Sequence, residues 1–209
     1  MTSQTDAGRP VVALDADGVL LDYHASYRDA WARAFGEPPA LRDHQAYWPM
    51  DRWEVRRLVD QELAQFRACF DETFWSTIPA IEGAVDACHA LRNAGIRLVC
   101  VSAIHAEFRD ARLRNLKDAG FPIDEMIDTG NEIGIESPKA SAIRSLNPVA
   151  FIDDYLPYMR GVPEHVHTAL ILREPNGSPN QGPELSIVRS THANLADFAS
   201  WWLQDKMLA

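Results

Sequence analysis

Short, almost wholly apolar segments recur along this sequence, and helical patterns separate them. The segments cover residues 11–14, 96–101, 149–152 and 168–172. Runs of this length without polar alternation are typical of strands that are covered on both faces, as in a parallel sheet. The sequence therefore predicts buried strands that alternate with helices.

The segments between these strands carry helical signals. Residues 82–94 and 105–119 have apolar side chains at helical spacing, and each pattern is followed by a glycine, Gly95 or Gly120. In the second pattern the buried face is predicted to hold Phe108, Leu113 and Leu116. Ser137 and Pro138 read as the N-cap and first residue of a helix that continues to about residue 145. Residues 186–190 are predicted to form a last short strand and residues 195–206 a final helix, which completes an α/β fold with a doubly wound, Rossmann-like parallel sheet.

One stretch interrupts this alternation. Residues 23–79 are rich in helical patterns, the clearest at 51–70, and contain no convincing strand. We expect a core domain of residues 1–22 and 80–209, with residues 23–79 as a small helical insertion. Four of the six tryptophans lie in this insertion, where a core role is favoured for each and Trp48 is the best candidate for contact with a ligand.

Polar residues follow three of the predicted strands. Asp15 and Asp17 follow the first, Ser102 the second, and Asp153 and Asp154 the third; Lys139 lies at the start of the helix before the third. Because ligands bind at the carboxyl ends of the strands in such sheets, we expect these side chains to share one site. Clustered carboxylates repel one another unless a cation neutralises them, and an all-oxygen site favours Mg²⁺.

These residues resemble the motifs of the haloacid-dehalogenase-like (HAD) hydrolases. The sequence from Asp15 to Leu20, DADGVL, is similar to the first motif, Ser102 to the second, Lys139 to the third and the Asp153-Asp154 pair to the fourth. All four occur in the order of the family, over roughly residues 10–22 and 80–172. The insertion at 23–79 lies where this family places a helical cap of the first type.

The resemblance implies a role for each of these residues. Asp15 would be the nucleophile that attacks phosphorus, and Asp17 the general acid and base. Family members that remove halide lack an aspartate at the position of Asp17, so the resemblance favours phosphate chemistry. Mg²⁺ would be held by Asp15, the main-chain carbonyl of Asp17 and Asp154, with Asp153 a direct or a water-mediated ligand. Ser102 and Lys139 would contact phosphate oxygens, and Gly18 would permit a tight turn beside them.

Several of these residues also have plainer interpretations. Ser102 could cap a helix, and Lys139, which follows Pro138 where many members of the family have lysine before proline, could be a surface side chain. Asp22 is predicted to be a helix N-cap, and His105 a surface residue.

The charge of the chain limits its partners. A formal net charge of −10 disfavours nucleic acid and anionic membranes as partners, and no apolar run approaches the length of a membrane span. Three cysteines without CxxC spacing are expected to be buried thiols, and the chain is expected to be cytoplasmic. The sequence does not indicate an oligomeric state.

The function expected from these observations is Mg²⁺-dependent hydrolysis of a small phosphate monoester through an aspartyl-phosphate intermediate. A phosphomutase on the same scaffold and a non-catalytic HAD-like binding module remain alternatives. A phospho-accepting receiver domain uses similar groups, but there the acidic pair comes first in the chain and the lysine last.

Overall fold

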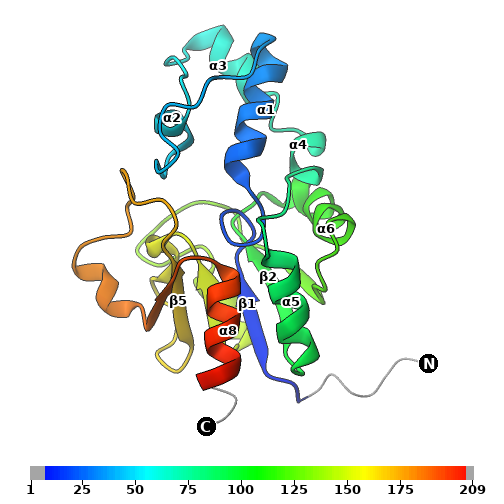
Figure 1. Ribbon diagram of the computed structural model, residues 1–209, viewed down its shortest axis with the longest axis vertical. Coiled ribbons are helices and arrows are strands. Elements are labelled where there is room, and N and C mark those ends of the chain that lie inside the picture. Colours follow the sequence, from blue (N-terminus) through cyan, green and yellow to red (C-terminus); the bar gives the residue numbers. More distant parts are fainter. Residues whose placement is uncertain (1–7, 206–209) are drawn as a thin grey trace.

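A six-stranded, fully parallel sheet forms the centre of the computed structural model, which describes residues 8–205 (Figure 1). The strand order is β3-β2-β1-β4-β5-β6. The strands are β1 (Val11–Leu14), β2 (Arg97–Ser102), β3 (Glu125–Asp128), β4 (Ala150–Asp153), β5 (His167–Ile171) and β6 (Ser190–His192). This confirms the predicted α/β, Rossmann-like fold. The chain runs outward from β1 through β2 to β3 and then returns to the other side of β1, so the strand order reverses between β1 and β4.

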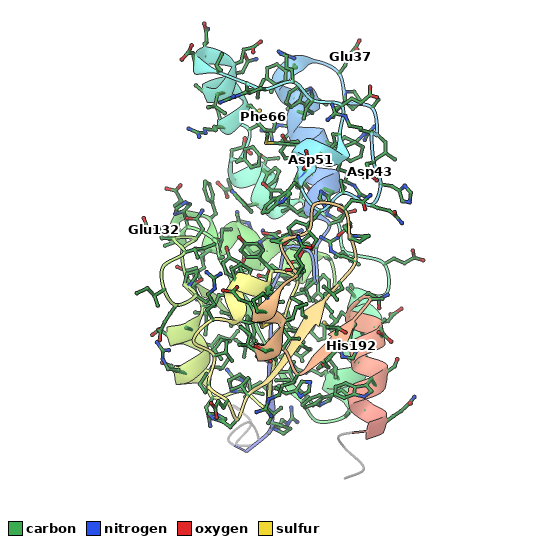
Figure 2. The ribbon with its side chains drawn as sticks, turned by 90° about the vertical axis from the view of Figure 1, so that its left-hand side faces the viewer. Glu37, Asp43, Asp51, Phe66, Glu132 and His192 are labelled. Atoms are coloured by element: carbon green, nitrogen blue, oxygen red, sulfur yellow. The ribbon has the colours of Figure 1, made fainter. Side chains whose placement is uncertain are left out.

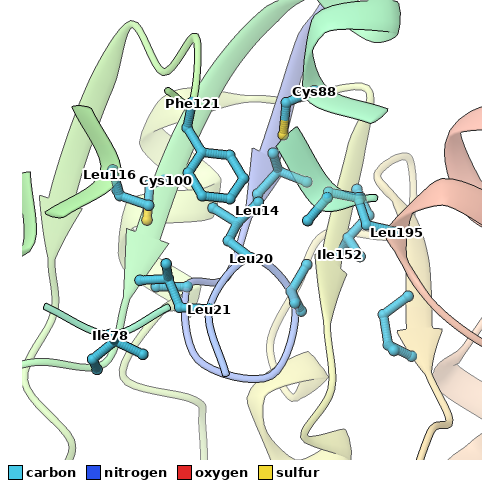
Figure 3. Close-up of a cluster of buried hydrophobic side chains, with 14 of the residues drawn as sticks. Leu14, Leu20, Leu21, Ile78, Cys88, Cys100, Leu116, Phe121, Ile152 and Leu195 are labelled. Atoms are coloured by element: carbon cyan, nitrogen blue, oxygen red, sulfur yellow. The ribbon is translucent and has the colours of Figure 1, made fainter. Parts of the chain in front are cut away.

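Helices cover both faces of the sheet. Alternate residues of the strands explain why: Val12 and Leu14 belong to one buried cluster, whereas Ala13 between them belongs to another. The first cluster includes residues of α5 (Ala84–Asn93), α6 (Arg109–Asp118) and α8 (Leu195–Asp205). Figure 3 shows part of it, with Leu14, Cys100 and Ile152 from adjacent strands lying together. The second cluster includes residues of α7 (Ala140–Leu146) and of the short helix η2 (Leu156–Met159).

Residues 23–79 contain four helices and lie above the carboxyl ends of the strands (Figure 1). These are α1 (Tyr23–Phe35), α2 (Pro49–Arg52), α3 (Asp60–Arg67) and α4 (Glu72–Ser76). Aromatic rings form the interior of this helical segment: Phe66, labelled in Figure 2, lies 5.1 Å from Tyr27 and 5.4 Å from Trp31 between ring centroids. The core role expected for Trp31 is therefore confirmed.

The single helix predicted over residues 51–70 is wrong. α2 ends at Arg52, and residues 53–59 are not helical before α3 begins at Asp60. The chain at the end of α2 pairs with an earlier segment, since Glu54 N–H donates to the Ala40 carbonyl (2.9 Å) and Arg42 N–H to the Arg52 carbonyl (2.9 Å). These tertiary hydrogen bonds replace the helical ones that the local pattern favoured.

Three further expectations need correction. β3, the edge strand, was not predicted, because its sequence EMID carries acidic residues at both ends and lacks the apolar run of the other strands. The strand predicted at 186–190 is instead the end of a short helix, η3 (Pro183–Ile187), and β6 begins only at Ser190. The predicted helix at 105–119 consists of the short helix η1 (Ala106–Phe108) followed by α6. α6 exposes Leu113, which was expected to be buried, and buries Arg112, which contacts Asp17.

Other predicted boundaries hold to within a few residues. Asp22 caps α1, accepting a hydrogen bond from Ala25 N–H (3.1 Å), and His105 is exposed, both as expected. The three cysteines are buried and free, also as expected. None of the helices within residues 8–205 combines the length and apolar character needed to cross a membrane.

Candidate active site

Three carboxylates meet where the strand order reverses. Asp15 follows β1 and is held against the neighbouring strand because its N–H donates to the Ile152 carbonyl (2.9 Å). Asp153 ends β4 and Asp154 follows it. One oxygen from each of Asp15, Asp153 and Asp154 lies within 4.8 Å of the others, and all three residues are buried. The parallel register thus brings together acids that lie about 140 positions apart in the chain.

Lys139 lies between two of these acids and is completely buried. Its Nζ is 2.6 Å from Asp15 Oδ1 and 2.6 Å from Asp153 Oδ2. Burial alone would lower the pKa of Lys139, but the two carboxylates outweigh it and raise the pKa, so the ammonium stays charged. Ser137 accepts a hydrogen bond from Lys139 N–H (3.0 Å), and Lys139 is itself the N-cap of α7. The interpretation of Lys139 as a surface residue is wrong.

The adjacent acids Asp153 and Asp154 differ in their surroundings. Both oxygens of Asp153 have partners, Oδ2 in Lys139 and Oδ1 in the Tyr155 N–H (2.9 Å). Among the described residues, the cation that contacts Asp154 is Arg173, at 3.5 Å from Oδ2. Burial raises the pKa of Asp154 to about 7, although Arg173 opposes the shift. Burial also raises the pKa of Asp153, although Lys139 opposes the shift, so the two acids differ in their partners and not in the direction of the shift.

Gly18 permits the close turn that follows Asp15. Its φ is +85°, and its N–H donates to the Leu21 carbonyl (2.9 Å). A Cβ at this position would lie 2.1 Å from Asp154 Oδ2 and 2.8 Å from an Arg173 nitrogen. Only glycine satisfies both the left-handed backbone and this contact.

Asp17 lines the cavity described below, and its carboxylate is held by Arg112, a residue that the sequence did not indicate. Arg112 Nη2 donates to both oxygens, at 2.8 and 2.9 Å. The Arg112 side chain is completely buried, whereas that of Asp17 is 30% exposed. Burial raises the pKa of Asp17, and the charge of Arg112 opposes this. Arg112 escaped notice because an arginine within a helical pattern ordinarily points to solvent.

Ser102 ends β2 and is buried, level with Asp128 of β3. It does not line the cavity described next, but its neighbour Ala103 does. Its carbonyl accepts hydrogen bonds from the N–H (3.1 Å) and the hydroxyl (3.3 Å) of Thr129.

A cavity of about 470 Å³ opens above these groups, between the sheet and the helical segment. Its polar floor includes Asp15, Asp17 and Asp154. Its walls are largely aromatic: Tyr23, Tyr47, Trp48, Trp75, Tyr155 and Tyr158.

Two of these tryptophans bear on the core role that was expected for the tryptophans of the insertion. Trp48 is 43% exposed and is not a core residue, in agreement with its selection as the best candidate for contact with a ligand. Trp75 was expected to be a core residue, but it both packs against the core and lines the cavity. His24 lies in the same wall, and burial lowers its pKa to about 4, so this imidazole is neutral at pH 7.

Beside this cavity, a loop of the helical segment is hydrogen-bonded to a loop that follows β5. Tyr47 N–H donates to the Asn176 carbonyl (2.9 Å), and Asn176 N–H donates to the Gln45 carbonyl (3.0 Å). The Asn176 amide also donates to Asp43 (2.8 Å), and Tyr47 Oη lies 3.4 Å from the Asp154 carbonyl. The loop of residues 43–48, marked in Figure 2 by Asp43, is thus attached to the loop that follows β5.

The three converging carboxylates fit a hard divalent cation. They offer only oxygen, lie close enough to share one ion, and leave open space on the cavity side. In a parallel α/β fold, the point where the strand order reverses is where ligands bind, so this cluster marks the candidate site for a ligand and a metal ion.

The family comparison agrees with this geometry. Residues 10–154 match the family model described as hydrolase, haloacid dehalogenase-like hydrolase. This range contains Asp15, Asp17, Ser102, Lys139 and the Asp153-Asp154 pair, and it covers more than half of the chain. The protein belongs to the haloacid dehalogenase-like hydrolases. Among curated proteins, no sequence is a significant match.

Solved structures with the same fold have several activities. A HAD family hydrolase from Deinococcus radiodurans R1, with bound phosphate and sodium, is 18% identical, with a TM-score of 0.64 over 95% of this chain and 97% of the other. An L-2-haloacid dehalogenase from Xanthobacter autotrophicus is 12% identical (TM-score 0.58; 94% and 99% covered). A Thermotoga maritima protein assigned as a β-phosphoglucomutase is 16% identical (TM-score 0.56; 94% and 99% covered). At these identities the likeness establishes the fold and leaves the reaction open.

Proposed function

We propose that this protein hydrolyses a small phosphate monoester with Mg²⁺ as cofactor, and that Asp15 carries the phosphoryl group between the two steps. The observation that carries this proposal is the presence of a second aspartate, Asp17, in the lining of the same cavity as Asp15. A phosphate ester releases an alkoxide, which needs a proton as it leaves, whereas a halide leaves without one. The phosphate bound to the Deinococcus relative is in keeping with this choice.

The first step forms the bond between an Asp15 oxygen and phosphorus and breaks the bond between phosphorus and the ester oxygen. Asp17, in its protonated form, gives its proton to that oxygen, and the alcohol leaves. In the second step the Asp17 carboxylate takes a proton from water, whose oxygen attacks phosphorus and releases the Asp15 carboxylate and inorganic phosphate. The protons balance over the cycle, and the raised pKa of Asp17 suits a group that must hold a proton in the first step.

Lys139 would contact the nucleophile in both steps. Its ammonium contacts Asp15 at 2.6 Å, and this contact keeps the nucleophile oriented and offsets charge on the transferring group. Ser102 is buried beside the cavity-lining Ala103, so its proposed phosphate contact from the end of β2 would require its hydroxyl to turn toward the cavity.

The charge of the site supports a metal cofactor. Four carboxylates (Asp15, Asp17, Asp153 and Asp154) face three cations (Lys139, Arg112 and Arg173), and Glu174 also pairs with Arg173 (3.1 Å). A phosphate dianion therefore needs further positive charge in order to bind. Asp15, the Asp17 carbonyl and Asp154 would hold Mg²⁺, with Asp153 acting through water because both of its oxygens have partners. Bound Mg²⁺ would supply charge neutralisation for the phosphate oxygens.

The helical segment would act as a cap over the reaction. Its aromatic side chains and the loop of residues 43–48 form the wall opposite the acids, which would exclude bulk water and select the leaving group.

The test is a panel of substrates with and without Mg²⁺. We expect inorganic phosphate from phosphate monoesters only when Mg²⁺ is present, and no chloride from 2-chloropropionate. Glucose 1-phosphate serves as the mutase substrate, since a mutase would give the 6-phosphate rather than free phosphate. The Asp15→Asn variant should lose at least ~10⁴-fold in kcat while keeping its fold by circular dichroism. Chloride release with no phosphate release would show the proposal to be wrong.

A further inference from the structure

Arg112 is the largest completely buried side chain of the described residues, and its burial needs a reason. It lies on α6, and among residues 8–205 its Nε and Nη1 atoms have no hydrogen-bond partner. A buried guanidinium with unsatisfied donors is a poor source of stability, because an apolar side chain of similar volume would serve at least as well. Its hydrogen bonds to the two oxygens of Asp17 are therefore better explained by what they do for Asp17.

The surroundings of Arg112 leave it little freedom to move. The ring of Trp75, on α4, lies 5.1 Å from the guanidinium carbon. One turn further along α6, Asn115 donates to the Ile78 carbonyl (2.9 Å). α6 is thus attached to the end of the helical segment one turn after Arg112. A group fixed in this way can hold the carboxylate that it contacts in one place.

Arg112 does not itself line the cavity, whereas Asp17 and Trp75 do. It would therefore act on a substrate only through its neighbours. One Arg112 nitrogen is shared between both Asp17 oxygens, so the contact constrains the position of the carboxylate and its rotation. The Asp17 side chain is still 30% exposed, and the residue lines the cavity.

We propose that Arg112 is the positioning residue of the acid/base aspartate: it holds the Asp17 carboxylate at the place from which the proton reaches the leaving oxygen. This rests on the proposed function, in which Asp17 protonates that oxygen as its bond to phosphorus breaks. The contribution of Arg112 must then depend on the leaving group. An alkoxide needs the proton, and a nitrophenolate leaves without it.

The experiment compares kcat and KM for benzyl phosphate and p-nitrophenyl phosphate, two esters with an aromatic ring of the same size. The variants are Arg112→Met, Arg112→Lys and Asp17→Asn, with Arg114→Met as the control because Arg114 lies on the same helix at the surface. Arg112→Met should reduce kcat for benzyl phosphate about 10-fold or more beyond its effect on p-nitrophenyl phosphate, as Asp17→Asn should, with KM changed little. Arg112→Lys should lose less, because it keeps the charge but not the shared contact. Arg114→Met should match the wild type on both esters.

The double variant Asp17→Asn/Arg112→Met gives a second test. If Arg112 acts through Asp17, the double variant should be no slower on benzyl phosphate than Asp17→Asn alone. Equal losses on the two esters, or losses that multiply in the double variant, would overturn the positioning role. Should Arg112→Met fail to fold, Arg112→Lys carries the same comparison. Failure of the wild type to hydrolyse either ester with Mg²⁺ would instead overturn the proposed function, and the role of Arg112 with it.

Discussion

Gly18 illustrates how strongly a single residue constrains this site. Asp15 and Asp154 come from different strands, and the turn after β1 must pass directly beside Asp154 for both to reach one ion. The left-handed φ of Gly18 and the 2.1 Å approach that a Cβ would make to Asp154 Oδ2 show that there is room for a hydrogen atom only. The local motif and the tertiary contact therefore demand the same residue.

A matched pair of glycine substitutions separates backbone strain from this contact. Gly95 has a similar φ of +87° but no atom within 4 Å of the place where its Cβ would be. Gly95→Ala should therefore lower the free energy of unfolding by about 1–2 kcal/mol, the cost of placing a side chain on a left-handed backbone. Gly18→Ala should cost about 1–3 kcal/mol more because the clash adds to the strain. It should also lower kcat roughly 100-fold by displacing Asp154.

Urea unfolding measures the stability of the two variants, and phosphate release measures their turnover. Equal stability of the two variants would contradict the assigned contact.

At the scale of an element, α6 departs from a simple amphipathic helix. Its buried face holds Arg112 and Asn115 beside Ala111 and Leu116, while Leu113 is 38% exposed. The two polar side chains reach the Asp17 carboxylate and the Ile78 carbonyl respectively, so the face that serves the site is partly polar. The apolar pattern of the sequence indicated the helix correctly but misplaced its buried face.

Two leucine substitutions on α6 test this orientation. Leu116 is 1% exposed in the main core cluster, so Leu116→Ala should destabilise the protein by about 2–5 kcal/mol. Leu113→Ala should cost less than ~1 kcal/mol, because Leu113 is partly exposed to solvent already. Chemical denaturation of both variants gives the comparison. A larger loss for Leu113→Ala would mean that the helix is rotated about its axis relative to the present structure.

At the scale of the whole molecule, the proposed metal site can form only when β1 and β4 are paired, because Asp15 follows one strand and Asp153 and Asp154 the other. Its carboxylates are buried and repel one another, which makes their ionised forms unfavourable. Burial, together with the charge of Asp15, accordingly raises the pKa of Asp154 to about 7. A cation that binds the folded chain at these oxygens should therefore stabilise the entire domain.

Thermal unfolding with and without Mg²⁺ checks this expectation. At a concentration 100-fold above its Kd, Mg²⁺ should add about 2.7 kcal/mol of stability, and Asp154→Asn should abolish the gain. Asp29→Asn, which removes an exposed carboxylate of α1, should respond to Mg²⁺ like the wild type. Because the metal needs the ionised form of Asp154, the gain should shrink as the pH falls from about 8 to about 6. An equal gain in Asp154→Asn would place the ion elsewhere.

The sequence by itself determined the strand–helix alternation, the parallel sheet and the set of acids at its carboxyl edge. These depend on local periodicity and on the rule that parallel strands end at one edge, so Asp15, Lys139, Asp153 and Asp154 could be brought together before any coordinates. Only the tertiary structure decided that residues 53–59 are not helical, that Arg112 is buried against Asp17, and that Tyr47 and Asn176 connect the helical segment to the sheet. Each of these depends on partners far away in the chain, whose hydrogen bonds and charges outweigh local propensity, and no pattern within one segment records them.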